Sequence, residues 1–165
     1  MIKHALAFLL LGAVMLRPSY GAGDGMPSWQ KCFFDGKEFR EGTASSGASV
    51  YWREGYLPVI QTRDEALRED RLPPGTGGVV VLCYIQIAGG KLPSHGGYVP
   101  LAGAVIEIRN GERMMAIKSD GEGYSVLALP AGEYEMRVQG FMRKVRVEKD
   151  KTTFLPVRAG KRMVD

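Results

Sequence analysis

The chain has 165 residues and a formal net charge of +4, from 22 Lys or Arg against 18 Asp or Glu. Its two histidines and two cysteines are too few for the zinc centres of common hydrolases, and no Cys-x-x-Cys spacing is present for redox chemistry or covalent haem attachment. The length suits one domain with a single core.

Residues 1–21 have the features of a secretory signal peptide. Lys3 precedes an apolar run over residues 5–16, and Ser19 and Gly21 supply small residues for cleavage after Gly21. The run is much shorter than the roughly 20 residues that a membrane-spanning helix needs. We therefore expect an exported protein, periplasmic or extracellular, with no stable membrane span. An uncleaved anchor is the alternative.

Residues 22–78 are predicted to be an N-terminal extension of short elements. Asp35-Gly36 predicts the turn of a small hairpin over residues 32–39, and residues 50–52 predict another short strand. The stretch between them, over residues 41–49, is rich in Gly, Ser, Ala and Thr and is expected to be a loop.

The second half of the extension is predicted to hold one helix. Thr62 and Glu65 have the spacing of a capping box, and good helix formers follow through Arg71. The Pro and Gly residues over 73–78 predict a linker before the main domain, and Gly75-Thr76-Gly77-Gly78 does not have the strand-before-helix context of a phosphate-binding loop.

Residues 79–158 carry the strongest pattern, in which apolar residues alternate with polar ones and glycine-containing turns separate the segments. Seven strands are predicted, at about residues 79–88, 104–109, 112–119, 124–129, 133–139, 141–148 and 152–158. Asn110-Gly111 fits a two-residue type I′ turn. No crossover of a dozen residues separates the strands, which favours an all-β antiparallel sandwich over a parallel arrangement, followed by a C-terminal tail at 159–165.

Alternation also predicts which side chains face the core. Ala104, Ile106 and Ile108 are expected inside, with Val105, Glu107 and Arg109 outside. The same alternation predicts further core-facing residues, namely Tyr124, Val126, Leu129, Tyr134, Met136, Val138, Val145 and Val147.

Four segments of this region look like the pattern of a known family: Gly103-Ala104-Val105-Ile106-Glu107-Ile108, Ser119-Asp120-Gly121-Glu122-Gly123-Tyr124, Leu129-Pro130-Ala131-Gly132-Glu133-Tyr134-Glu135-Met136-Arg137-Val138 and Gly140-Phe141. Over residues 79–157 the chain resembles carboxypeptidase regulatory-like domains, within the wider group of prealbumin-like and collagen-adhesin B-type sandwiches. The resemblance implies a seven-stranded antiparallel Greek-key-like β-sandwich that acts as an accessory, scaffolding or binding module of secreted or cell-surface proteins.

Cys32 and Cys83 are the only cysteines. In an exported protein we expect them to form one disulfide, which would tie the extension to the first core strand. A free Cys83 buried in an apolar strand is the alternative.

The residues that related enzymes require are few. His95, in a glycine-rich loop over residues 89–97, is the only histidine after signal removal and has no Gly-x-Ser-x-Gly elbow beside it. Asp120 and Glu122 lie in a predicted β-turn with too few oxygen ligands for calcium. Asn110 is the only asparagine, and it lies in a turn, which argues against an isopeptide crosslink. We expect no catalytic residue, no metal and no cofactor; a transthyretin-like hydrolase is kept as a distant alternative.

Two surfaces are candidate binding sites. Arg137, Lys144 and Arg146 are predicted on the outer face of one hairpin, and residues 137–165 hold nine Lys or Arg against three acids. A polyanionic glycan, a lipid headgroup or an acidic protein is the expected ligand, and a solvated charged face is the alternative.

The second surface is aromatic and includes Trp52 and Tyr98. Its other members are Trp29, Phe33, Phe34, Tyr51 and Tyr56. These rings are suited to stacking on sugars or to protein contacts, or alternatively to packing the extension onto the sandwich.

Together these features predict a non-enzymatic, exported β-sandwich that serves as an accessory, scaffold or binding module of a bacterial envelope or surface assembly. An envelope or surface protein is the expected partner. A carbohydrate-binding module is the main alternative, and no nucleic acid is expected because no aromatics are interleaved with the basic hairpin.

Overall fold

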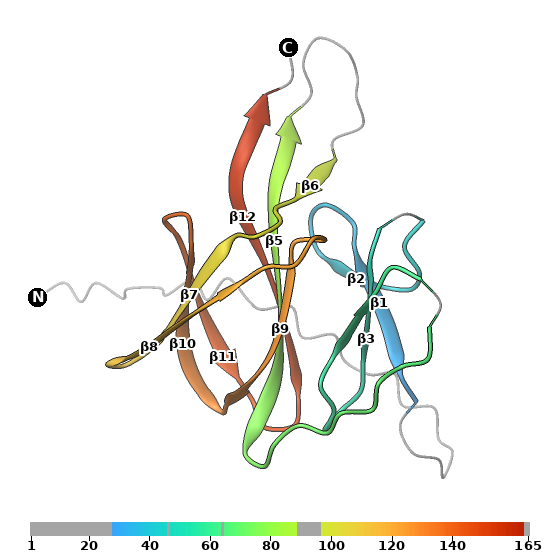
Figure 1. Cartoon of the computed structure of the whole chain (residues 1–165), viewed down its shortest axis with the longest axis vertical. Helices are drawn as coiled ribbons and strands as arrows, with labels where there is room; N and C mark the ends of the chain where they lie inside the picture. The colour runs from blue at the N-terminus through green and yellow to red at the C-terminus, as the bar shows by residue number, and fades with distance from the viewer. Residues whose placement is uncertain (1–27, 46, 64, 89–96, 164–165) are drawn as a thin grey trace, which may run out of the picture.

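The computed structural model describes residues 28–45, 47–63, 65–88 and 97–163, so the expected signal peptide and His95 lie outside the described residues. Within these ranges all regular structure is β (Figure 1). The strands are β1 (Gln30–Phe34), β2 (Phe39–Glu41), β3 (Ser49–Trp52), β4 (Val59–Gln61), β5 (Thr76–Ala88), β6 (Tyr98–Pro100), β7 (Val105–Asn110), β8 (Arg113–Lys118), β9 (Tyr124–Pro130), β10 (Gly132–Val138), β11 (Phe141–Val147) and β12 (Thr152–Met163).

The strands form three sheets, which lie as stacked layers (Figure 1). The extension sheet has the order β2-β1-β3-β4. The middle sheet has β5 next to β12, while β6 and β9 share the other edge of β5. The hairpin sheet has the order β11-β10-β7-β8. The architecture is therefore an all-β sandwich with a third layer added by the extension.

The first core lies between the middle sheet and the hairpin sheet. Val79, Val81 and Cys83 of β5 point into it, and Ile106 and Met136 meet them from the other side. All of these side chains are fully buried. The inward set predicted for β7, β10 and β11 is confirmed, because those residues alternate with exposed ones as the pattern requires.

The second core lies between the middle sheet and the extension sheet. Val80, Leu82 and Tyr84 of β5 point into it, opposite Phe34 and Trp52 of the extension. Each fully buried aliphatic side chain contributes about 1.5–3 kcal/mol, so this interface holds the extension firmly in place.

Burial on two faces explains the composition of β5. Its run Val79-Val80-Val81-Leu82-Cys83 is apolar at every position, as expected of a strand covered on both sides. The strand β9 beside it behaves alike, with Tyr124 in the second core and Leu129 in the first. A buried side chain of β5 or β9 can therefore belong to either core, and the alternation of the sequence alone does not tell which.

The predicted seven-strand count and Greek-key topology are not confirmed, because the described residues hold twelve strands. Each of the seven predicted ranges does overlap one strand. The prediction of purely antiparallel pairing was wrong in one place: β12 pairs with β5 in parallel, from Thr152 with Gly78 to Met163 with Ala88. The intervening hairpin sheet serves as the crossover. Strand β12 also runs into the range predicted as a tail, with a register shift between Arg158 and Gly160.

The predicted helix over residues 62–71 is wrong, since the described part of that segment is irregular. Leu57 N donates to Asp70 O at 2.8 Å and Leu72 N donates to Gly55 O at 3.0 Å, which ties the segment alongside residues 55–57. A helix of about ten residues is marginal in isolation, and this one has no apolar face to bury, so backbone pairing prevails.

The linker predicted over residues 73–78 is wrong in its second half, over residues 76–78. Strand β5 begins at Thr76, and Gly77 and Gly78 are buried within it. A Cβ on Gly77 would lie 2.1 Å from Glu148 O and 3.0 Å from Lys151 O, so the turn between β11 and β12 approaches too closely for a side chain.

The predicted type I′ turn is displaced by one residue. Asn110 pairs with Arg113, so the turn residues are Gly111 and Glu112, of which only Gly111 has a positive φ, at 57°. Asn110 instead donates from Nδ2 to Glu133 O at 3.1 Å. The turn with two positive φ values joins β10 to β11, at Gln139 and Gly140.

The predicted disulfide is absent, because Cys32 and Cys83 are both free and buried. Cys83 points into the first core and Cys32 into the second, so the middle sheet separates their side chains. Cβ vectors that point apart cannot be bridged without moving the backbone. Docking of the extension is achieved by aromatic packing instead.

Replacing Gly77 by Ala is expected to lower the free energy of unfolding by about 1–3 kcal/mol, because the new methyl group meets backbone that cannot move aside. Chemical denaturation measures the change. Gly121→Ala is the matched control, because a Cβ there meets nothing within 4 Å, and it should stay within about 0.5 kcal/mol of the native protein. Equal losses in both variants would contradict the steric explanation.

Stability is expected to fall in alkali. Burial raises the pKa of Cys32 to about 12, with a smaller effect of Glu41, and burial raises that of Cys83 to about 11, against 9.0 for an ordinary thiol. Above pH 9 the unfolded chain loses thiol protons that the folded chain keeps, so the free energy of unfolding should decrease by up to about 1.4 kcal/mol per pH unit for each thiol. Denaturation between pH 8 and about 11 measures it.

The same experiment on Cys32→Ala should give a shallower slope, because one of the two thiols is gone. Two free buried cysteines would be contradicted if the free energy of unfolding of the native protein did not change with pH. They would also be contradicted if the chain, unfolded without a reducing agent, contained no thiol that reacts with a thiol reagent.

Candidate functional site

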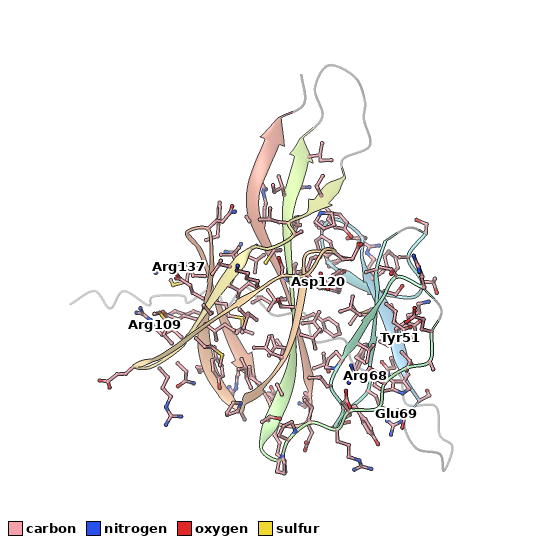
Figure 2. The ribbon with its side chains drawn as sticks, viewed as in Figure 1. Tyr51, Arg68, Glu69, Arg109, Asp120 and Arg137 are labelled. Carbon is pink, nitrogen blue, oxygen red and sulfur yellow. The ribbon has the colours of Figure 1, made fainter. Side chains whose placement is uncertain are left out.

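The candidate site is the solvent face of the hairpin sheet. Alternation in β10 and β11 points Tyr134, Met136 and Val145 into the first core and their neighbours outward. Arg137, Lys144 and Arg146 accordingly share one exposed face, as predicted. Figure 2 shows Arg109 and Arg137 together on this side of the molecule.

The register adds acids that the sequence prediction missed. Arg137 lies directly opposite Glu107 of β7, and Glu135 lies between Arg109 of β7 and Lys144 of β11. Opposite charges therefore face one another across the strands, whereas along β11 the outward residues Lys144 and Arg146 have the same sign. Directly opposed pairs of this kind stabilise a sheet by roughly 0.2–1 kcal/mol each.

The third basic residue is also paired. Arg146 lies opposite Glu133, with 3.8 Å between Arg146 Nε and Glu133 Oε1. Both side chains are about three-quarters exposed, so this contact contributes little stability. Its effect is on the surface potential, because each predicted anion-binding residue has a glutamate across from it. The centre of the face is charge-balanced, because Glu107 and Glu135 lie opposite Arg137 and Arg109, and the excess of basic residues lies on the edge strands β8 and β11.

Exposed apolar side chains lie among these charges. Six large hydrophobic residues of the described chain are exposed, and five belong to the hairpin sheet. The register places Val105, Met114 and Met142 on the solvent face with the charges, and Met115 and Phe141 on the core side of the two edge strands. Met114 is 65% exposed and Met142 43%, and both border a shallow depression on the solvent face. The charged residues Glu107, Arg109, Glu135 and Arg137 line the rest of it.

The two predicted aromatic residues belong to the interior. Trp52 is 7% exposed and packs against Phe154 with ring centroids 6.1 Å apart. Tyr98 is half-buried between Phe34, at 4.9 Å, and Tyr84, at 5.9 Å. Burial raises the pKa of the Tyr98 phenol. These contacts favour the core-packing alternative over a platform for sugars.

A buried arginine cluster was missed from the sequence. Arg53 is 9% exposed; its guanidinium lies 3.8 Å from the Tyr56 ring centroid, and its Nη1 lies 3.8 Å from Glu69 Oε1. Trp29 closes the cluster, with its ring 5.8 Å from that of Tyr56 and its Nε1 donating to Glu69 at 3.4 Å. Figure 2 places Glu69 on the extension side, away from Arg137. The cluster anchors the segment that follows β4.

The turn at Asp120 has the structural role expected of it. Asp120 Oδ1 accepts hydrogen bonds from Glu122 N at 2.9 Å and Tyr124 N at 2.8 Å. Within the described ranges no group of three His, Cys, Asp or Glu side chains is placed to hold a metal ion. The same part of the chain holds no helix with the length and apolar character of a membrane span.

Removing two acids should turn the balanced face into an anion-binding one. The variant Glu107→Gln with Glu135→Gln is expected to elute from heparin at higher salt than the native protein, because Arg109, Arg137 and Lys144 lose their partners. The control, Glu54→Gln with Glu65→Gln on exposed positions of the extension, makes the same change in net charge. It should elute close to the native protein; an equal shift in both variants would contradict a local effect.

No family model and no curated protein matches this chain. Among solved structures the chain is similar to the Bacillus anthracis TIE protein, with 15% sequence identity over 68% of this chain and a TM-score of 0.39. The match spans 23% of that protein's length. So distant a similarity carries no functional argument. The fold is consistent with a β-sandwich, and membership of the carboxypeptidase regulatory-like family is not confirmed.

Proposed function

We propose that this chain is an exported, non-catalytic β-sandwich that acts as an accessory, scaffold or binding module in a bacterial envelope or surface assembly. Its proposed docking site is the solvent face of the hairpin sheet, and its proposed partner is a protein. Kinship with carboxypeptidase regulatory-like domains, which commonly have such roles, is part of the same proposal.

The observation that carries the proposal is the combination of charge and apolar exposure on one face. Methionine and arginine are enriched at protein interfaces, and here Met114 and Met142 flank the alternating Glu and Arg residues. Side chains carried on paired strands also lose little backbone freedom on binding.

Charge balance favours a protein over a polyanion. At the depression, a glycan or headgroup with one sign of charge would be repelled by Glu107 and Glu135 as well as attracted by Arg109 and Arg137. A protein surface can present both signs in the complementary order, which gives specificity more than raw affinity. The expected partner surface therefore alternates acidic and basic residues around an apolar contact for Met142.

The other functions have less support. A carbohydrate site built on Trp52 would need a ring that packs in the second core. A hydrolase would depend on His95, which lies outside the described residues.

The experiment is affinity capture from a native envelope extract followed by reconstitution with the purified partner. We expect a stoichiometric complex that Arg137→Glu weakens at least about tenfold, because Arg137 then faces Glu107 as a like charge. The control Arg68→Glu reverses an arginine whose side chain is 82% exposed on the opposite side of the molecule (Figure 2), and it should bind like the native protein.

Equal weakening by both variants, or crosslinks that map to the extension sheet, would contradict docking on the hairpin sheet. Retention on a polysaccharide column that survives Arg137→Glu and is lost in Tyr98→Ala would favour the carbohydrate alternative instead.

A further inference from the structure

Strand β8 is an open edge of the hairpin sheet. It pairs with β7 on one side, and the described residues place no strand on its other side. Figure 1 shows it at the margin of the molecule. Backbone N–H and C=O groups along such an edge are free to pair with another strand.

The two edges of this sheet differ in how they are protected. Strand β11, at the opposite edge, carries Arg143, Lys144 and Arg146, the kind of side chains that discourage strand addition. The centre of β8 is Met114-Met115-Ala116-Ile117, without a charge, a proline or a bulge. Met114 and Met115 are 65% and 49% exposed.

The two-residue turn determines which backbone groups of β8 are free. Asn110 and Arg113 flank the turn, so they form a hydrogen-bonded pair in which Arg113 faces β7. Hydrogen-bonding direction then alternates along the strand. The N–H and C=O groups of Met114, Ala116 and Lys118 therefore point away from β7, toward the open edge. Of these, Lys118 O already accepts a hydrogen bond from Ser125 Oγ at 2.8 Å, so the groups offered to another strand are those of Met114 and Ala116 and the N–H of Lys118.

We propose that β8 pairs with β8 of a second copy of this chain, in antiparallel register about a two-fold axis at Met115. In such a pairing, each residue whose backbone N–H and C=O point toward the open edge must lie opposite a residue of the second copy that does the same. Centring on Met115 meets this condition by placing Met114 opposite Ala116 of the second copy.

Charge selects this register over its neighbours. With Met115 at the axis, Glu112 of each copy lies opposite Lys118 of the other, giving two opposite-charge pairs. Centring on Met114 would oppose Glu112 to Ala116, and centring on Ala116 would oppose Lys118 to Met114, so both charge pairs would be lost. Directly opposed unlike charges stabilise a strand pair.

The dimer joins two hairpin sheets into one continuous sheet. The two Met115 side chains meet beneath it, beside Ile117, which already packs on the first core. On the opposite face the two solvent faces become one extended surface. This inference rests on the β8 edge and does not depend on the proposed protein partner.

The first test is mass and crosslinking of the full chain. Light scattering during gel filtration should give the mass of two chains at high concentration. Under mild oxidation Met115→Cys should form a disulfide-linked dimer, because residues at the axis are directly opposed with Cα atoms about 4.5–5.5 Å apart. The control Ala116→Cys should not, since it faces Met114. A single-chain mass at all concentrations, or equal crosslinking by both variants, overturns the proposal.

The second test blocks the edge. Ala116→Pro removes an N–H that points away from β7, so the monomer should fold, as its circular dichroism would show, while dimerisation is lost. A folded variant that still dimerises overturns the pairing.

Charge reversal decides the question even if Ala116→Pro fails to fold, because it changes only exposed side chains. Glu112→Lys alone and Lys118→Glu alone should each weaken the dimer at least about tenfold, and the double variant should restore it. Weakening without rescue overturns the Met115-centred register.

Discussion

The structure depends on one strand that is covered on both faces. The odd-numbered residues Val79, Val81 and Cys83 of β5 hold the hairpin sheet, and the even-numbered Val80, Leu82 and Tyr84 hold the extension sheet. A polar residue in this run would be buried whichever way it pointed, at a cost of several kcal/mol without a partner. The extension is therefore a structural layer of the molecule and not an appendage.

Local patterns predicted much of the fold because they depend on neighbouring residues. The alternation around Ile106 and Ile108 and the hairpin turn at Asp35-Gly36 have physical causes within a few positions, and the structure retains both. The helix expected after Thr62 failed because backbone pairing with residues 55–57 outweighs its weak propensity. The predicted disulfide was wrong because β5 is covered on both faces. Cys83 points into the first core and Cys32 into the second, which cannot be known from the sequence without knowing that the extension forms a separate layer.

The candidate site shows the same limit. The exposed positions of Arg137, Lys144 and Arg146 follow from period-two alternation. Their neutralisation by Glu107, Glu135 and Glu133 does not, since it depends on the register between strands, part of which joins segments distant in sequence. A surface charge counted along the chain thus overstates the potential that a ligand meets.

Parallel pairing of β12 with β5 has a consequence for how the protein is made. Phe154 completes one core and Leu155 and Val157 complete the other, so neither interior can close until the last strand is available. A nascent chain would acquire a stable tertiary structure only after β12 had emerged from the ribosome, and contacts so distant in sequence also form slowly. Such delayed closure would suit the export proposed for this protein, because a chain that has not yet folded can be threaded through a translocation channel.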